Sequence, residues 1–392
     1  MKYRLCDVTK YANTGADAIK RAPIVDEDTG LRCLRIGDVS QKRDFDEWGF
    51  TKTTVEDYKR YKLEQNDIIV ARTGNTIGVN CFIENDIEAV YNNGLIRIKA
   101  DTDKIIPKFM YYLIRSQDCQ NFIQSIAYGT STQPNMKIHE FLNFEFEYYD
   151  IDIQNKIVSI IDSIEKKIEL NNSTNNNLEQ QIQSIFKRNF IDSEYKFVKD
   201  TTIGDICKCE LGGTPSRTKP EYWNGNIAWI NSGEVNKFRI TKPSEYITDW
   251  GLSRSATKLL PKKTTVLAIT GATLGQISLL EIDSCANQSV VGIIENDTLP
   301  YEFIYPYVVN NIKELISHQT GGAQQHINKQ NIESLKLLLP DNEIINNYKK
   351  LVKPLFETIS NNCFENESLI QLRDTSLPKL MSGEIDVDKV EV

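Results

Sequence analysis

A short glycine motif, T-G-x-T-x-G, occurs twice in this chain and could in principle hold a phosphate group. The two occurrences are Thr73–Gly78 and Thr270–Gly275, and each follows an apolar run. Neither matches the G-x-x-x-x-G-K-[ST] loop of nucleotide-binding proteins or the G-x-G-x-x-G of dinucleotide sites. We therefore interpret both motifs as tight turns between a strand and a loop, and not as nucleotide sites.

Residues that could bind a metal are scattered. Cys207 and Cys209 have no second Cys or His pair at zinc spacing, and His139, His318 and His326 lie singly. Zinc sites need four such ligands at characteristic separations. The sequence therefore predicts no metal site.

Catalytic motifs of the nucleic-acid enzymes are also missing. A nuclease would need Pro-Asp followed by [DE]-x-K, but Pro340-Asp341 comes after Glu194-Tyr195-Lys196, which is the reverse order. No N-P-P-Y or D-P-P-Y run, as an adenine methyltransferase needs, occurs anywhere. We interpret four acids near the strand-like runs as ordinary surface or turn residues: Asp38, Glu64, Asp67 and Glu234.

What remains is a set of side chains suited to recognition. The stretch 211–235 gathers hydroxyl, amide, basic and aromatic residues into a turn-rich segment. Hydroxyls and basic groups can bind phosphates, while amides and Arg can read base edges. For any single one of these residues, a purely structural role is an equally good interpretation: the segment could be a polar loop whose Trp packs into the core. Our candidate DNA-binding residues are Lys59, Arg60, Arg72, Thr73, Asn75 and Thr76 in the first half of the chain, and Thr214, Ser216, Arg217, Lys219, Trp223, Asn224, Thr270 and Thr273 in the second.

The glycine motifs are part of a longer internal repeat. They align at an offset of 197 residues, and Gly37-Asp38-Val39 aligns with Gly233-Glu234-Val235 at 196. Short β-like runs and helical patterns alternate in both halves, for example Asp67–Ala71 and Pro107–Ser116 in the first. Each half is therefore predicted to be a mixed α and β domain with polar loops.

The repeat continues into two helical segments. At an offset of 191, Ile153, Ile157, Ile160, Ile161, Ile164 and Ile168 fall on Ile344, Tyr348, Leu351, Val352, Leu355 and Ile359. The spacing puts each set on one stripe of a helix, close to the a/d seam of a coiled coil. Such a stripe must be buried, and the obvious partner is the helix of the other copy. We therefore predict an antiparallel coiled coil that relates the two copies by a pseudo-two-fold axis.

These patterns divide the chain into four segments. The first helical segment crosses Asn171–Asn177, a run of poor helix propensity. We favour a continuous helix, because Leu178, Ile182 and Phe186 resume helical spacing, but a polar linker between two shorter helices stays open. The predicted segments are a first domain over 1–150, a helix over 151–195, a second domain over 196–340, and a helix with the C-terminal tail over 341–392.

Composition narrows the class of protein. The 392 residues carry a net charge of −8, the wrong sign for a protein that coats nucleic acid through its overall field. Most of the excess acid lies in the helical segments and the tail, so each domain could still carry a basic face. The eight Cys are scattered, and the chain contains neither a signal-peptide core nor an apolar run of about 20 residues. We expect reduced thiols and a cytoplasmic location.

Together these features resemble the specificity subunit of a Type I restriction-modification enzyme. The resemblance covers essentially the whole chain. The first copy departs from the pattern because it lacks the GGTPSR element, and the start of each helix is degenerate at 150–154 and 340–343. The resemblance is carried by the tandem plan, GGTPSRTKPEYWNG (212–225), the two T-G-x-T-x-G motifs, Gly129–Gln133, its counterpart Gly321–Gln324, and LPKLMSGEI (377–385).

The resemblance implies a division of labour. Two target-recognition domains would each read one half of a bipartite site in double-stranded DNA. The two helices would form the spacer that sets the gap and docks two methyltransferase (modification) subunits, which restriction and translocase subunits join. S-adenosylmethionine, ATP and Mg would then belong to partner subunits, with no cofactor in this chain.

Two other classes of function compete with this interpretation. A structural adaptor could use the domains to bind protein partners and the helices only as a scaffold, although the divergence between the copies disfavours it. A self-contained nuclease would need an acidic metal cluster, which the sequence lacks.

Overall fold

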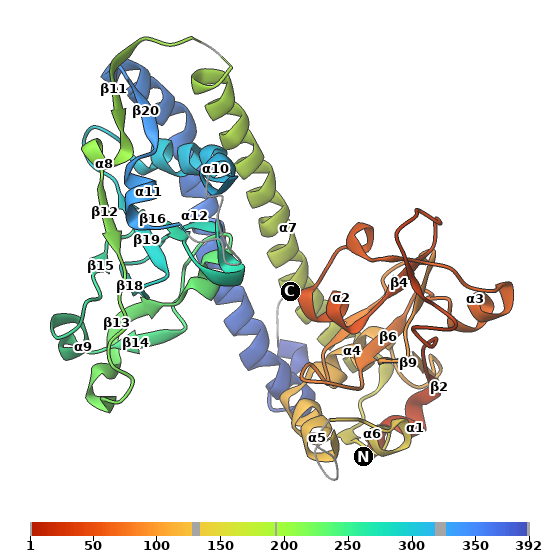
Figure 1. Cartoon of the computed structure of the whole chain (residues 1–392). Helices are drawn as coiled ribbons and strands as arrows, with labels where there is room; N and C mark the ends of the chain where they lie inside the picture. The colour runs from red at the N-terminus through yellow and green to blue at the C-terminus, as the bar shows by residue number, and fades with distance from the viewer. Residues whose placement is uncertain (1, 128–133, 193, 318–326, 390–392) are drawn as a thin grey trace. The chain divides into compact units, whose positions relative to one another are not determined.

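The computed structural model describes residues 2–127, 134–192, 194–317 and 327–389. The chain forms two compact units, one from residues 1–166 and 370–392 and the other from 167–369 (Figure 1). Each unit therefore contains one globular domain and part of both long helices. None of the helices in the described ranges combines the length and apolar character needed to cross a lipid bilayer.

The first domain is built on two four-stranded sheets. One has the order β2-β9-β6-β7 and is antiparallel throughout, and the other has the order β3-β5-β4-β8 with β4 and β8 parallel. A two-stranded sheet, β1-β10, joins the ends of the domain. The strands are β1 Lys2–Arg4, β2 Thr9–Thr14, β3 Ile24–Val25, β4 Arg32–Leu34, β5 Phe50–Thr51, β6 Asp67–Ala71, β7 Asn80–Phe82, β8 Ala89–Tyr91, β9 Leu95–Ala100 and β10 Glu145–Glu147.

Helices cover the first of these sheets. The apolar faces of α4 and α5 share a core with β6 and β9, whereas the second sheet has a smaller core around Leu34 and Tyr91. The helices are α1 Leu5–Val8, α2 Ile36–Gln41, α3 Val55–Tyr61, α4 Pro107–Arg115, α5 Gln117–Ala127 and α6 Ile138–Phe141, with short 3-10 turns at Phe45–Glu47 and Val387–Lys389.

The second domain repeats this framework. Its four-stranded sheets have the orders β12-β19-β16-β17 and β14-β13-β18-β15, and β13 and β18 are parallel, as β4 and β8 are. β11 and β20 lie side by side as a separate pair (Figure 1). The strands are β11 Phe197–Thr202, β12 Lys208–Leu211, β13 Trp223–Ile230, β14 Glu245–Ile247, β15 Leu259–Leu260, β16 Thr265–Ala268, β17 Ile277–Leu279, β18 Ser284–Ala286, β19 Val290–Ile294 and β20 Lys336–Pro340.

The helices of the second domain are fewer within the described ranges. The principal one is α10, which packs on β16 and β17 as α4 packs on β6 and β7. Strands and helices thus recur in the order that the internal sequence repeat predicts. The helices are α8 Ile203–Ile206, α9 Asp249–Ser253, α10 Tyr301–Ser317 and α11 Lys329–Glu333, with 3-10 turns η2 Pro220–Tyr222, η3 Ser232–Asn236 and η4 Gly271–Thr273.

Each domain is followed by a long helix. The first, α7, runs unbroken over Ile151–Phe190, and the second, α12, over Asn342–Ser382. The polar run 171–177 therefore continues the helix, and the alternative of a linker between two helices is wrong. In the first unit Tyr149 contacts Met381 and Glu165 contacts Arg373, so the two helices run antiparallel there.

The apolar stripe is buried, but the other helix is only part of what covers it. In the first unit Ile157 and Ile161 share a core with Phe109 of α4 and Leu377 of α12. The stripe residues Ile153, Ile164, Ile168, Ile344, Tyr348, Val352, Leu355 and Ile359 are likewise buried or half-buried. Leu351 departs from the prediction because it is 50% exposed, whereas Ile345 and Phe356 are buried. The buried stripe of α12 is therefore shifted around the helix axis relative to the prediction, because α12 also packs on its own domain, in the core that contains Phe303 of α10.

Charged side chains fasten each domain to the helices. Arg239, whose side chain is fully buried, donates from Nη2 to Glu179 of α7 at 2.7 Å. In the first unit Glu165 of α7 accepts from Arg115 of α4 and from Arg373 of α12, both at 3.0 Å. Breaking the Arg239–Glu179 pair would leave an uncompensated buried charge, so this contact opposes movement of the second domain on α7.

Candidate nucleic-acid interface

The loop that leaves β12 is held by two glycines. A Cβ on Gly212 would lie 2.2 Å from the carbonyl oxygen of Asn287, and one on Gly213 would lie 2.6 Å from the amide nitrogen of Thr257. Real side chains do not tolerate such distances, so only glycine permits this close approach of three backbone segments. Packing therefore explains the two glycines of the GGTPSR segment. Their close contacts hold the start of the loop that carries the following polar residues.

Arg217 is the most constrained of the candidate residues. Its guanidinium lies 3.6 Å from the ring centre of Trp223, and it forms a two-pronged ion pair with Glu245, in which Nη2 donates to Oε1 at 2.8 Å. The hydrogen bond from Arg217 lowers the pKa of Glu245, so this carboxylate stays ionised. Because about half of the Arg217 side chain is exposed, the stack presents a rigid planar group to solvent.

Two loops of the second domain meet at the turn 287–289. Thr214 donates to the side chain of Gln288 at 2.5 Å, and the backbone amide of Ile269 donates to Ser289 at 2.9 Å. The structure thus brings the GGTPSR loop and the second T-G-x-T-x-G motif, with Thr270 and Thr273, to a common site. In that motif β16 ends, η4 turns the chain and β17 returns, as predicted for a tight turn.

The other candidates of this loop are exposed. Ser216 lies within hydrogen-bonding distance of Thr218, at 2.8 Å, and Lys219 donates to the hydroxyl of Tyr222 at 3.1 Å. Asn224 has a φ of 61°, a left-handed conformation that Asn tolerates better than most residues. These side chains are therefore positioned by local turns and are accessible to a ligand.

In the first domain the T-G-x-T-x-G loop is bound to the segment that follows α5. Arg72 donates to the side chain of Asn135 at 3.0 Å, Thr73 pairs with Asn135 as an isolated bridge, and the amide of Gly74 donates to Pro134 at 3.2 Å. Asn75 is exposed and Thr76 is half-buried. The structure therefore groups four of the six candidates of this domain on one loop.

The remaining two candidates of the first domain, Lys59 and Arg60, lie elsewhere. Both are exposed and occupy the last turn of α3, Val55–Tyr61. The Arg60 guanidinium lies 5.4 Å from the ring centre of Tyr61. The candidates of the first half thus occupy two different elements, a helix and a loop.

The candidates named from the sequence do not include the first domain's counterpart of the GGTPSR loop. Gly15 follows β2 as Gly212 follows β12, and a Cβ on Gly15 would lie 2.2 Å from the carbonyl oxygen of Tyr91. The next amide, of Ala16, donates to Tyr91 at 2.8 Å, as that of Gly213 donates to Ala286. The signal was available, because Gly15 and Gly212 also stand 197 residues apart.

Three of the four acids interpreted as surface or turn residues are buried, and each of these three accepts a backbone amide of a turn. Asp38 is 5% exposed and Glu234 is 6% exposed, and each accepts the backbone amide three residues before it, of Arg35 and Asn231. Asp67 in β6 is fully buried and pairs with Lys99 at 3.0 Å. Only Glu64 is exposed as predicted. These acids cap short helices or neutralise buried cations, because a chain reversal there needs a side-chain acceptor.

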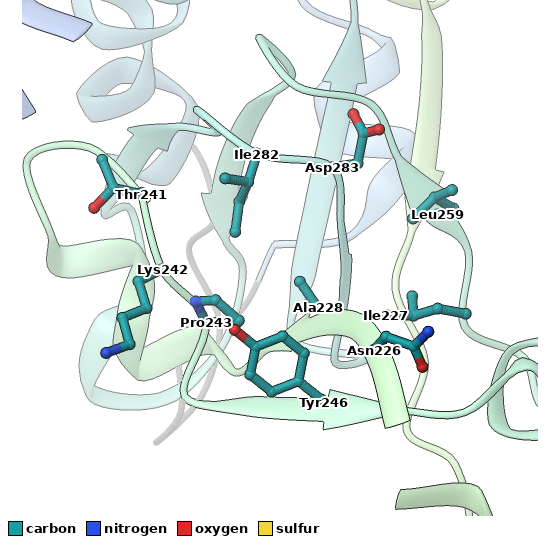
Figure 2. Close-up of a pocket in the computed structure, with 10 residues that line it drawn as sticks. All are labelled: Asn226, Ile227, Ala228, Thr241, Lys242, Pro243, Tyr246, Leu259, Ile282 and Asp283. Atoms are coloured by element: carbon teal, nitrogen blue, oxygen red, sulfur yellow. The ribbon is translucent and has the colours of Figure 1, made fainter. Parts of the chain in front are cut away.

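A hollow of about 410 Å³ lies beside the Glu245 strand of the second domain. Figure 2 shows Tyr246 and Pro243 on one side of it, Ile282 on the other, and Lys242 at its edge. The hollow is open and mostly apolar, and its other lining residues are Asn226, Ile227, Ala228, Thr241, Leu259 and Asp283.

Two of the segments that carry the family resemblance, Gly129–Gln133 and Gly321–Gln324, lie outside the described residues. Among the residues that are described, no group of three or more His, Cys, Asp and Glu is arranged to hold a metal ion.

Comparisons with known proteins place this framework in one family. The model of the Type I restriction modification DNA specificity domain matches residues 1–180 and again 195–372. The Type I restriction enzyme HindI specificity subunit of Haemophilus influenzae is 24% identical over 82% of this chain and 87% of its own length. The MjaIX specificity subunit of Methanocaldococcus jannaschii is 25% identical, covering 74% and 71%.

A solved structure shows the same fold. The crystal structure of a Type I restriction-modification S subunit from M. genitalium superimposes with a TM-score of 0.59 at 16% identity, and the match covers 97% of this chain and 96% of that one. The similarity in fold thus extends over nearly the whole length of both chains. This chain belongs to the family of Type I restriction-modification DNA specificity subunits.

Proposed function

We propose that each domain of this specificity subunit reads one half of a bipartite site in double-stranded DNA. The observation that carries the proposal is the combination of a shared framework with divergent loops. The sheet orders recur in both domains, while the loop after Gly15 and the loop after Gly212 have unrelated sequences. Two domains that bound identical partners would need identical loops, whereas two different half-sites require different ones.

In the second domain the reading group is the stack of Arg217 on Trp223. A guanidinium held in one plane can donate two hydrogen bonds to guanine O6 and N7 in the major groove. Arg217 would exchange the carboxylate of Glu245 for the base, and a base that offers no such acceptors would leave the guanidinium with Glu245. The hydroxyls of Thr214, Ser216, Thr270 and Thr273, and the ammonium of Lys219, would bind phosphates.

The chemistry of modification and restriction belongs to partner subunits in this proposal. The two helices dock two methyltransferase subunits and set the gap between half-sites, and restriction and translocase subunits join that assembly. The partners bind S-adenosylmethionine, ATP and Mg, flip the target adenine and supply much of the phosphate contact. This chain is then a non-catalytic recognition subunit, and its net charge of −8 is compatible with DNA binding because its partners supply cations.

Co-expression with the modification subunit tests the proposal directly. Methylated adenines are mapped across the host genome, and one motif with two defined halves and a fixed gap is expected. Exchanging residues 1–150 for the recognition domain of another specificity subunit should change only one half of that motif. A change in both halves would show that the domains do not read independently.

Binding by the isolated chain gives a second test. We expect weak, salt-sensitive binding without partners and a specific gel shift once the modification subunit is added. Tight sequence-specific binding by the chain alone at physiological salt would contradict the assignment of phosphate contacts to the partners. A complex with the modification subunit that shifts no DNA would favour the structural adaptor instead.

A further inference from the structure

The loop that follows Gly15 in the first domain ends in a turn that holds itself in shape. The side chain of Asp17 accepts the backbone amides of Ile19 at 3.0 Å and Lys20 at 2.8 Å. The carbonyl of Asp17 accepts the amides of Arg21 and Ala22 at 3.1 and 2.9 Å. These backbone hydrogen bonds lower the pKa of Asp17, so the carboxylate that closes the turn stays ionised at neutral pH. The turn is therefore ordered before any ligand arrives.

Two side chains at the tip of this turn are left to solvent. Ile19 is 83% exposed, and Lys20 is also exposed. Ala22, at the end of the turn, is fully buried and fixes the loop to the domain core around Leu34 and Tyr91. An ordered turn with one apolar and one cationic side chain at its tip has the composition of a base-reading element, because it has both a donor and an apolar contact group.

Arg21 joins this turn to α3. Its Nη1 donates to the hydroxyl of Tyr61 at 2.6 Å, and its Nε lies 3.9 Å from the carboxylate of Asp57. The exposed cations Lys59 and Arg60 belong to the same helix. Arg21 thus joins the turn that carries Lys20 to the helix that carries these two cations, and exposed cationic side chains of this kind can bind phosphates.

We propose that the turn Asp17–Ala22 is the target-reading loop of the first recognition domain, with Ile19 and Lys20 at the base edges and with Lys59 and Arg60 on phosphates. The inference rests on the proposed function. The turn Asp17–Ala22 corresponds to the GGTPSR loop of the second domain. Each loop follows the equivalent strand of its domain, β2 or β12, and each begins at a glycine that packs against the backbone at the end of β8 or β18. Lys20 donates to guanine acceptors, and Ile19 packs on a thymine methyl group.

The test uses the full chain co-expressed with its modification subunit. The variants Lys20→Ala and Ile19→Ala are compared with Lys10→Ala and Ile24→Ala, which remove an exposed cation and an exposed apolar side chain of the same domain, on strands β2 and β3. Methylation is measured on a plasmid library in which each position of the wild-type motif is varied. Folding of every variant is checked by its melting temperature, which should not change, because all four side chains are exposed.

The expected result is confined to one half of the motif. Lys20→Ala and Ile19→Ala should each lower discrimination at one base position in that half by about 5- to 150-fold. The other half and the two control variants should keep wild-type selectivity. Lys59→Ala should instead weaken methylation uniformly across sequences and with a smaller salt dependence.

Several outcomes would overturn the inference. Wild-type selectivity in both loop variants would show that the turn does not read the target. A loss that is uniform across all sequences in Lys20→Ala would make Lys20 a phosphate contact only. A wild-type complex without any sequence-specific methylation would contradict the proposed function itself, before the loop is considered.

Discussion

Asn171 of α7 donates from its side-chain amide to Oδ1 of Asn366 of α12 at 2.9 Å, and both side chains are less than 10% exposed. Asn366 in turn donates to Asn172 at 2.9 Å, and Asn362 donates to Asn175 at 2.9 Å. The helices therefore run antiparallel in the second unit too. A buried amide in a helix pair is satisfied in one register only, which makes such residues register markers.

This relationship predicts the effect of replacing the amides. Asn366→Leu alone should lower the free energy of unfolding by about 1–3 kcal/mol, because the buried amide of Asn171 loses one of its two acceptors and keeps only Glu365. Asn171→Leu combined with Asn366→Leu should recover part of this loss, since an apolar pair replaces a polar one. Asn177→Leu, on the exposed side of α7, serves as the control. Denaturant titration measures the wild type, Asn171→Leu, Asn366→Leu, the double variant and the control, and strictly additive losses would show that the two residues are not coupled.

The register itself can be trapped by a disulfide. The side-chain nitrogen of Asn175 lies 3.6 Å from Sγ of Cys363, so Asn175→Cys should cross-link to Cys363 under mild oxidation. In the Asn171→Leu, Asn366→Leu background the yield of this cross-link should fall if the amides determine the register. An undiminished yield would assign the register to the domain cores alone. Non-reducing mass spectrometry of peptides identifies the bond.

The close approach at Gly212 predicts a large effect of a single methyl group. Gly212→Ala should cost about 1–3 kcal/mol of stability, because its Cβ would overlap the Asn287 carbonyl and force the backbone apart. Gly37→Ala, whose Cβ would meet nothing within 4 Å, should be neutral or slightly stabilising. Thermal unfolding compares them, and equal melting temperatures would refute the packing argument.

Glu302 of α10 predicts a pH dependence. Its side chain is fully buried, neither carboxylate oxygen has a hydrogen-bond partner in the described part of the chain, and burial raises its pKa above the usual 4.5. The folded state therefore binds a proton more tightly than the unfolded state, so stability falls as pH rises from 4.5 through the raised folded pKa. Below pH 4.5 both states are protonated and the effect vanishes.

Glu302→Gln removes this titration. At pH 4 the variant should have about the same melting temperature as the wild type. At pH 8 its melting temperature should be higher, by about 2–4 °C for each 1 kcal/mol by which ionised Glu302 destabilises the wild type. A melting-temperature difference that is the same at both pH values would mean that ionisation of Glu302 is not responsible. Calorimetry over pH 4–8 gives the comparison.

The ion pair on Trp223 predicts a change of specificity in the second half of the target. Arg217→Lys keeps the charge but loses both the fork and the stack, so discrimination at one position should fall by about 1–3 kcal/mol. The first half serves as the internal control, because its reading loop is in the other domain. Methylation of a randomised target library measures both, and an unchanged motif would exclude Arg217 as a reader.

Much of the architecture could be predicted because it depends on local patterns. The repeat at an offset of 197, the apolar runs that became β6 and β16, and the 3.6-residue stripe on both helices each act within a short stretch of chain. Local pattern also made the stretch around Arg217 a candidate for recognition, because its residue types suit that role. The candidates named from the sequence did not include the loop of Ile19 and Lys20, because only the glycine before it, Gly15, aligns with Gly212 at the repeat offset and the residues that follow do not match.

The sequence by itself determined two tandem mixed domains, each followed by an amphipathic helix, and excluded the usual catalytic motifs. Only the tertiary structure decided which side chains act together. Three arginines donate hydrogen bonds to partners 28 to 60 residues away in the sequence: Arg217 to Glu245, Arg21 to Tyr61, and Arg239 to Glu179. The physical reason is that partners of buried and stacked charges are chosen by the packing of distant strands and helices, which no local periodicity encodes.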